Sequence, residues 1–341
     1  MATRIYKTSF AATGDKEVLA TADQPDGKVS LQAGWTPDYE LPNDNANYRP
    51  VGRAEMNGIL SEVTEGLGEL QLNGFAKWQA IDGGWPLGSY VLRNAVVYRS
   101  TTDNNTSDPD AVGSGWINPL SGRLLGITTY TTAGTFTFTP NPLAKAWRVI
   151  VTGAGGGSGG VNTTAAGESK ASTGAGGGGT TIHNYTTVFT SAIVVVGAGG
   201  SAGTAAPTNG GNGAISSFAP VGGVAISATG GSGSTGVSSA ALMPSQQSGA
   251  SGGVGAGGNL FPNIIGGNGG NAQFPRTGNG ISGYGGSSYW SPGGAPVAGV
   301  NAAGNVGRFG SGAGGCIAQE AGNFQNGATG GAGVVYIEEY A

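Results

Sequence analysis

Apolar and polar residues alternate in different ways along the chain, and the first change of pattern predicts a helix. Residues 1–49 are short apolar pieces separated by Gly, Pro, Asn and Asp, which is typical of turns. From residue 53 onward, apolar side chains recur at alternating spacings of four and three, as in a coiled-coil seam. These positions are Met56, Leu60, Val63, Leu67 and Leu70. We predict a helix over 53–74 that either packs against its own domain or joins copies of the chain.

Residues 75–122 predict a small β module rich in aromatic rings. Alternation between Ser89 and Ser100 indicates two short strands around Arg93-Asn94. The large rings are Trp78, Trp85, Tyr90, Tyr98 and Trp116. They either form the core of a domain too small to have another one, or present a platform for a sugar.

Strands dominate the pattern after residue 128. Runs of β-branched and apolar residues with turn residues at their ends predict extended structure. The predicted strands are 135–139, 147–152, 180–186, 193–196, 215–218, 224–228 and 334–338. Residues 123–341 are therefore expected to form a β-sandwich-like domain, and the fold class is mainly β.

Glycine sets the character of the stretch 230–333. The whole chain has 70 glycines, which is unusual. In this stretch the glycines cluster at no fixed period, which predicts neither helix nor ordinary strand. Collagen is excluded because residues 230–236 do not carry glycine at every third position. Large rings between the clusters exclude a flexible linker. We expect a packed slab of extended, three-residue-per-turn glycine segments, inserted between neighbouring strands at the tip of the domain.

Charge divides the chain and excludes several functions. Only seven charged side chains follow residue 150, and the net charge is -4 without a basic cluster, which argues against nucleic-acid binding. Cys316 is the single cysteine, so no intrachain disulfide can form. The first ten residues lack a secretory pattern, and no run of 18 apolar residues occurs. We expect synthesis in a cytoplasm and no membrane insertion.

Catalytic and cofactor motifs are incomplete. The glycines of Gly155-x-Gly157-x-x-Gly160 follow a predicted strand, but no helix pattern follows them, so we expect no nucleotide cofactor. The turn at Asp103 lacks the glycine and the final acid of a calcium loop, so no metal is expected. His183 is the only histidine, and no Asp follows residue 150. The pattern predicts a protein that is not an enzyme.

Several motifs resemble the tail-fibre proteins of contractile-tailed bacteriophages and related prophages. In the first half they are Thr3-Arg4-Ile5-Tyr6-Lys7-Thr8, Gly34-Trp35-Thr36-Pro37-Asp38-Tyr39-Glu40, Arg53-Ala54-Glu55-Met56-Asn57-Gly58-Ile59 and Tyr98-Arg99-Ser100. The spacing of rings in 75–122 resembles small chitin-binding modules. The stretch from Thr131 to Tyr340 is similar to the glycine-rich domains that end phage fibres.

The resemblance implies a homotrimeric fibre in the tail of the virion. Residues 1–52 would attach to the baseplate or to a preceding fibre protein, and 53–74 would form a short trimeric coiled coil. The C-terminal tip would bind lipopolysaccharide sugars or an outer-membrane protein of the host. Two alternatives remain open, a tail protein that degrades polysaccharide and a structural segment that carries a separate adhesin.

Large aromatic and basic residues within the slab are the candidate receptor contacts. They are Arg276, Tyr284, Tyr289, Trp290, Arg308 and Phe309. Rings stack on sugar faces at a low entropic cost, and the arginines could hold phosphate or acidic sugar groups. The alternative is that the rings fill the interior of the slab, because glycine supplies no apolar side chain.

Overall fold

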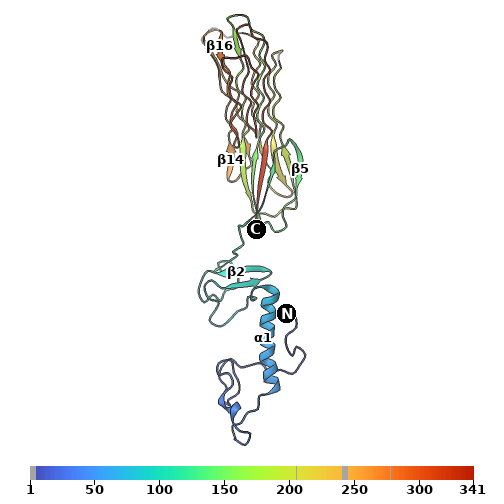
Figure 1. Ribbon diagram of the computed structural model, residues 1–341, viewed down its shortest axis with the longest axis vertical. Coiled ribbons are helices and arrows are strands. Elements are labelled where there is room, and N and C mark those ends of the chain that lie inside the picture. Colours follow the sequence, from blue (N-terminus) through green and yellow to red (C-terminus); the bar gives the residue numbers. More distant parts are fainter. Residues whose placement is uncertain (1–4, 205, 240–244, 277) are drawn as a thin grey trace. The chain divides into compact units, whose positions relative to one another are not determined.

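The computed structural model describes residues 5–204, 206–239, 245–276 and 278–341. The chain forms two compact units, Met1–Ser121 and Gly122–Ala341 (Figure 1). The first unit contains η1 (Pro37–Glu40), α1 (Arg53–Asn73), β1 (Tyr90–Arg93), β2 (Val96–Ser100) and β3 (Trp116–Ile117). The second unit contains only strands and extended segments among its described residues, so the fold is mainly β, as predicted.

The helix predicted over 53–74 is confirmed as α1. It begins after Gly52, whose N–H donates to the Glu55 carboxylate at 3.0 Å. It ends at Gly74, which adopts the left-handed conformation with φ 75° and donates its N–H to the Leu70 carbonyl. These end contacts are local, so the helix boundaries follow from the sequence nearby.

A strap of residues 5–19 lies along one face of α1. Gly58 and Gly68 form notches there, because a Cβ at either position would overlap a backbone carbonyl of the strap, that of Glu17 or of Tyr6. Between the notches, the ammonium of Lys16 donates to the Ser61 hydroxyl at 3.0 Å. The glycines that weaken this helix by propensity therefore admit a backbone that packs against it.

Replacing Gly68 by alanine should loosen the strap without removing the helix. The added methyl group displaces the backbone at Tyr6, whereas a Cβ at Gly66 meets no atom within 4 Å. Gly66→Ala is the matched control and should stabilise the helix by about 1 kcal/mol. Limited proteolysis followed by mass spectrometry should show faster cleavage within 5–19 for Gly68→Ala only. Equal cleavage in the two variants would contradict this packing.

Two five-stranded antiparallel sheets form the base of the second unit. The first has the order β13 (Gly255–Ala256), β11 (Ile226–Ala228), β10 (Ser216–Pro220), β9 (Ala192–Val196) and β5 (Gly134–Phe138). The second has the order β14 (Phe261–Ile264), β8 (Thr180–Tyr185), β6 (Ala146–Thr152), β18 (Val334–Tyr340) and β4 (Leu124–Tyr130). The predicted strands are thereby confirmed in type.

The core of this base lies between the two sheets. Trp147, Val149, Val151, Val335 and Ile337 contribute to it from β6 and β18. Phe138, Phe189 and Phe218 contribute rings from the other side, with Trp147 and Phe189 only 4.5 Å apart between centroids. Because inward residues alternate along β18, Tyr336, Glu338 and Tyr340 face away from this core.

Beyond the strands, the chain continues as glycine segments bonded to one another in three dimensions. Along 153–161, every third N–H donates to the same neighbouring segment, except that Gly159 donates to the Ser234 hydroxyl. One set reaches 176–179, the second reaches 208–214 and the third reaches 325–331. Consecutive residues thus donate in three different directions in turn. This is the pattern of packed three-residue-per-turn helices.

Carbonyl groups of 153–161 accept from a second set of neighbours. These donors lie in 200–203, in 231–237 and at Ala313. The segment is therefore enclosed on all sides by other backbones, and residues 153–161 are buried throughout. Segment 172–179 is enclosed in the same way, with bonds to the regions around Gly270, Ala313 and Ser232.

The close approach of these backbones explains the glycines. A Cβ at Gly155 would overlap the carbonyl of Ser311, and one at Gly156 would overlap that of Ser232. Alanine and serine occur where a side chain has room, as at Ser158, whose hydroxyl donates to the Gly314 carbonyl at 2.7 Å. The slab is a backbone lattice that encloses small hydrophobic clusters, the largest ring in them being that of Phe274.

Two expectations about the slab need correction. The slab begins at Gly153 and is built from several segments of the chain, each of which follows or precedes a sandwich strand. It is therefore not one insertion over 230–333. That stretch also contains ordinary strands, contrary to the prediction, because side-chain-bearing residues interrupt the glycines. They are β13 and β14 in the sandwich, and β15 (Ala272–Arg276), β16 (Asn279–Ile281) and β17 (Ile317–Gln319).

The far end of the slab carries short sheets and turns. There β12 (Ser245–Gln247) and β16 flank β15, and β17 pairs with β7 (Ser169–Ala171). In Figure 1, β16 lies at the end of the slab opposite the C-terminus and the sandwich strands β5 and β14. We call this the distal end of the second unit.

Candidate functional site

The predicted seam positions of α1 are exposed in the chain. The exposed fractions are Met56 37%, Leu60 37%, Val63 59%, Leu67 42% and Leu70 50%. The strap covers the other face, at Gly58, Ser61 and Gly68. An apolar stripe at coiled-coil spacing is therefore partly exposed on α1.

Two large rings of the small β module pack against each other. Trp116 is buried and packs edge-on against Trp85 at 6.5 Å. Both indole N–H groups donate to backbone carbonyls, those of Ser107 and Gln79. Two of the candidate sugar-binding rings are thus occupied by the packing and hydrogen bonds of the module.

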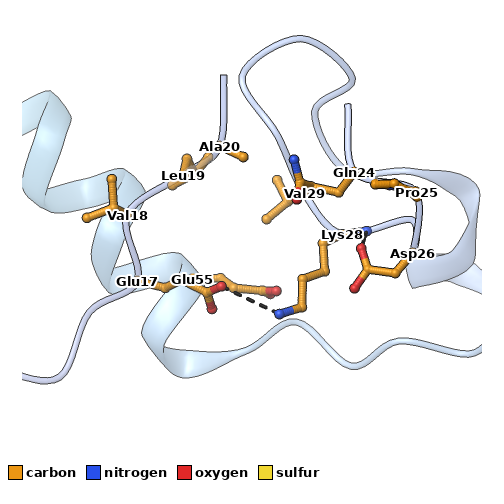
Figure 2. A pocket seen from close by; sticks show the side chains of 10 residues that line it. All are labelled: Glu17, Val18, Leu19, Ala20, Gln24, Pro25, Asp26, Lys28, Val29 and Glu55. Atoms are coloured by element: carbon orange, nitrogen blue, oxygen red, sulfur yellow. Dashed lines mark hydrogen bonds and ion pairs between the residues drawn. The ribbon is translucent and has the colours of Figure 1, made fainter. Parts of the chain in front are cut away.

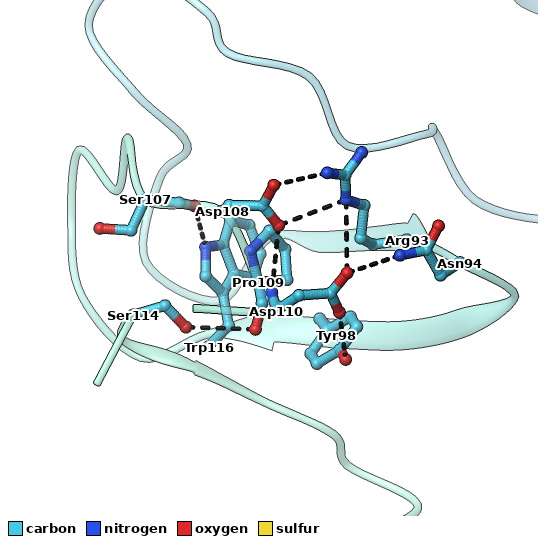
Figure 3. Close-up of polar contacts among 9 residues, drawn as sticks. All are labelled: Arg93, Asn94, Tyr98, Ser107, Asp108, Pro109, Asp110, Ser114 and Trp116. Carbon is cyan, nitrogen blue, oxygen red and sulfur yellow. Dashed lines mark hydrogen bonds and ion pairs between the residues drawn. The ribbon is translucent and has the colours of Figure 1, made fainter. Parts of the chain in front are cut away.

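Charged groups lock the loop of this module in place (Figure 3). Arg93 forms a bidentate contact with Asp108 and lies 3.7 Å from Asp110. Asp110 also accepts from the Tyr98 hydroxyl at 2.9 Å. The Arg93 guanidinium lies over the Trp78 ring at 4.8 Å from its centroid. Asp108 and Asp110 are therefore both ion-paired with Arg93.

A cavity of about 350 Å³ lies between the strap and the following loop of the first unit (Figure 2). Glu17, Asp26, Lys28 and Glu55 line it together with short apolar side chains. Lys28 reaches Glu17 at 3.6 Å, so part of the charge is paired within the wall. The cavity carries mixed charge and no catalytic arrangement.

Four of the candidate receptor residues lie where the slab meets the sandwich. Trp290 donates its indole N–H to the Thr152 hydroxyl at 3.0 Å, at the end of β6. Tyr289 packs edge-on against Trp290 and is 47% exposed. The turn that contains exposed Arg308 and Phe309 lies beside them, because the Ser288 hydroxyl donates to the Phe309 carbonyl at 2.6 Å.

The other two candidates lie elsewhere in the slab. The ring of Tyr284 covers Gly270 and remains 59% exposed. Arg276 is the last residue of β15 near the distal end, and its side chain lies outside the described part of the chain. The structure therefore groups Tyr289, Trp290, Arg308 and Phe309 and separates them from Tyr284.

Sequence reasoning missed the polar side chains that close the edges of the lattice. Asn212 and Asn209 accept the N–H groups of Gly233 and Gly236 at 2.9 Å each. On another edge, Asn268 and Asn271 accept from Gly252 and Gly249. The signal was the spacing of three between the asparagines, which repeats the helical turn of the lattice.

The titratable groups of the second unit have structural partners. His183 contacts the Gly257 carbonyl at 3.0 Å and stacks on Tyr185 at 4.2 Å. Glu339 is buried and accepts from the Trp147 indole and the Asn141 N–H. Burial raises the pKa of the Cys316 thiol, so this thiol is protonated at neutral pH. These groups act as packing and hydrogen-bonding residues.

The described residues contain neither a candidate metal site nor a candidate membrane span. No group of three or more His, Cys, Asp or Glu side chains within them is placed to hold a metal ion. No helix among them is long and apolar enough to cross a membrane.

Comparison with known families identifies the second unit. Residues 131–340 match the family described as a glycine-rich domain. The chain belongs to this family. The match covers more than half of the chain and includes the glycine lattice and every sandwich strand except β4, which ends at Tyr130. No curated protein matches the chain.

Proposed function

We propose that this protein is a receptor-binding tail-fibre protein of a bacteriophage that attaches the virion to its host. The observation that carries the proposal is the glycine lattice, which projects turns and short sheets from a β-sandwich on a fully hydrogen-bonded support. Loops held by a rigid scaffold are typical places for binding. The N-terminal motifs that resemble phage tail fibres supply the biological context.

The attachment role gives each part of the chain a task. The strap and loops of residues 1–52 would bind the baseplate or a preceding fibre protein. The exposed seam of α1 would join three copies, and trimerisation would multiply weak binding at single sites by effective concentration. The receptor would be a lipopolysaccharide glycan or an outer-membrane protein of the host.

In the proposed role, the protein is not an enzyme and needs no cofactor. Hydrolysis of a glycoside requires two placed carboxyl groups. Glu168 and Glu320 instead accept backbone N–H groups of Ala165 and Gly167. Their local hydrogen bonds favour a role in shaping distal turns over a role in catalysis.

Substitution of an exposed distal turn tests the proposal. Fluorescently labelled full-length protein should bind cells of at least one strain in a panel of Gram-negative bacteria. The double variant Asn323→Ala with Phe324→Ala should lower that binding at least about tenfold, because both residues are exposed at the distal end. Leu143→Ala is the control, since Leu143 is 65% exposed in a loop at the sandwich end.

Two outcomes would contradict the attachment role. Absence of binding to every strain would argue for a structural segment that carries a separate adhesin. Equal binding by the distal variant and the wild-type protein would place the receptor contact elsewhere on the chain. Release of new reducing ends from host polysaccharide would support the enzyme alternative.

A further inference from the structure

One face of the sandwich combines aromatic rings with a carboxylate and a guanidinium. Tyr336, Glu338 and Tyr340 project from β18 on the side opposite the buried Val335 and Ile337. The Trp290 ring extends this row, with its centroid 5.5 Å from that of Tyr336. We call Tyr289, Trp290, Tyr336, Glu338, Tyr340 and Arg148 the aromatic face.

Hydrogen bonds hold the aromatic face in a fixed arrangement. The hydroxyls of Tyr336 and Tyr340 donate to the two different carboxylate oxygens of Glu338, at 3.2 and 2.8 Å. The Trp290 indole is anchored to Thr152 at 3.0 Å. These rings therefore lose little further freedom when a ligand binds, which lowers the entropic cost of association.

The polar groups of this face retain hydrogen-bonding capacity. Each oxygen of a carboxylate can accept two hydrogen bonds, so Glu338 can accept more than the two tyrosine bonds. Arg148 lies directly opposite Glu338 in the register of β6 and β18. Its Nε is buried and has no hydrogen-bond partner within the part of the chain that the structure describes, so this atom is not open to a ligand. The acceptor oxygens of Glu338 thus lie between aromatic rings.

We propose that the aromatic face is a binding site for an extended, uncharged oligosaccharide. Sugar rings present apolar C–H faces, which stack on aromatic side chains, and hydroxyl groups that both donate and accept. Arg148 and Glu338 are register partners on adjacent strands and carry opposite charges, which favours a neutral ligand over a phosphate or an acidic sugar. Tyr336 and Tyr340 are four strand residues apart, about 13 Å, so the row is long enough for more than one sugar ring.

A protein partner fits this face less well. The core of a protein interface is usually depleted of charged residues, whereas Glu338 lies in the middle of this row. The proposal depends only on the sandwich face and does not require that the protein belong to a phage. It also differs in place from the distal receptor contact, because the row lies along β18 at the sandwich end.

A glycan array tests the site with the full-length protein. Labelled protein should bind printed neutral oligosaccharides and leave sialylated and phosphorylated ones at background. Tyr289→Ala and Glu338→Gln should each weaken that binding about tenfold, whereas Phe324→Ala, a distal exposed ring, should change it less than about twofold. Tyr289 is chosen over Trp290 because the Trp290 indole also bonds the sheet.

Circular dichroism and thermal melting of each variant exclude loss of folding as the cause. Absence of binding to every neutral glycan would overturn the proposal, as would unchanged binding by both face variants. Preferential binding to acidic glycans would also overturn it. Loss of cell binding in the distal variant with intact glycan binding would separate this site from the proposed receptor contact, so the two proposals fail independently.

Discussion

Gly155→Ala should destabilise the second unit by at least about 3 kcal/mol, the upper range for a group forced into a packed interior. The new methyl group would overlap the Ser311 carbonyl, and the backbone of 153–161 has neighbours on all sides. No flexible side chain can move aside, because the obstructing atoms belong to the main chain. Relief therefore requires separation of lattice segments, which breaks their hydrogen bonds.

Thermal melting and thiol reactivity together measure this effect. Cys316 is buried at the distal part of the lattice, and burial raises the pKa of its thiol, so a thiol reagent at pH 7 should react only when the lattice opens. Gly126→Ala in β4 is the control, because its Cβ would lie 3.8 Å from the nearest atom, an oxygen of Glu339. Equal melting and equal thiol reactivity in the two variants would contradict the lattice.

Local patterns in the sequence were enough to predict α1 and the main strands of the sandwich, but not the strands within 230–333. The alternating spacing from Met56 to Leu70 predicted α1, and the end contacts of that helix involve residues within four positions. Strands such as β6 and β18 were recognisable from β-branched and apolar runs. Interactions with neighbours along the chain decide these elements, so the sequence carries their signal.

The arrangement of the glycine segments could not be predicted in the same way. One glycine segment could pair with another as well as with its actual neighbour. The hydrogen bonds between segments are made by backbone N–H and C=O groups, which every residue except proline possesses. Gly155, for example, bonds to Gly331, which is far away in sequence. The sandwich strands determine where each glycine segment starts. The starting positions then determine which segments form hydrogen bonds with one another. Only the asparagines spaced by three indicate which segments lie at an edge.

The aromatic face shows the same limit for a binding site. Tyr289 and Trp290 were recognisable as large rings in a turn, but their neighbours Tyr336 and Arg148 come from β18 and β6. Thr152 fixes the position of Trp290 through a hydrogen bond across more than a hundred residues of chain. Contacts of this kind depend on the folded lattice, so sequence reasoning assigned the rings to the slab alone.

Leu60→Asp should convert the proposed trimer to a monomer. In the proposed trimer, Leu60 faces the same residue of two other chains, and a carboxylate in such an apolar interface costs several kcal/mol unless it is protonated. The strap packs at Gly58 and Gly68, on a neighbouring face of α1, and leaves Leu60 37% exposed. Size-exclusion chromatography with multi-angle light scattering should show the change in mass.

Leu72→Asp provides the matched control for this last prediction. Leu72 is 55% exposed on the same helix but lies outside the spacing that links Leu60, Val63, Leu67 and Leu70. A charge at this position has no partner chain to meet, so the trimer should persist. A monomeric wild-type protein would refute the seam, and a trimer that survives Leu60→Asp would assign trimerisation to the second unit. Loss of the trimer in both variants would mean that the added charge disrupts the helix itself and not contacts of its apolar stripe.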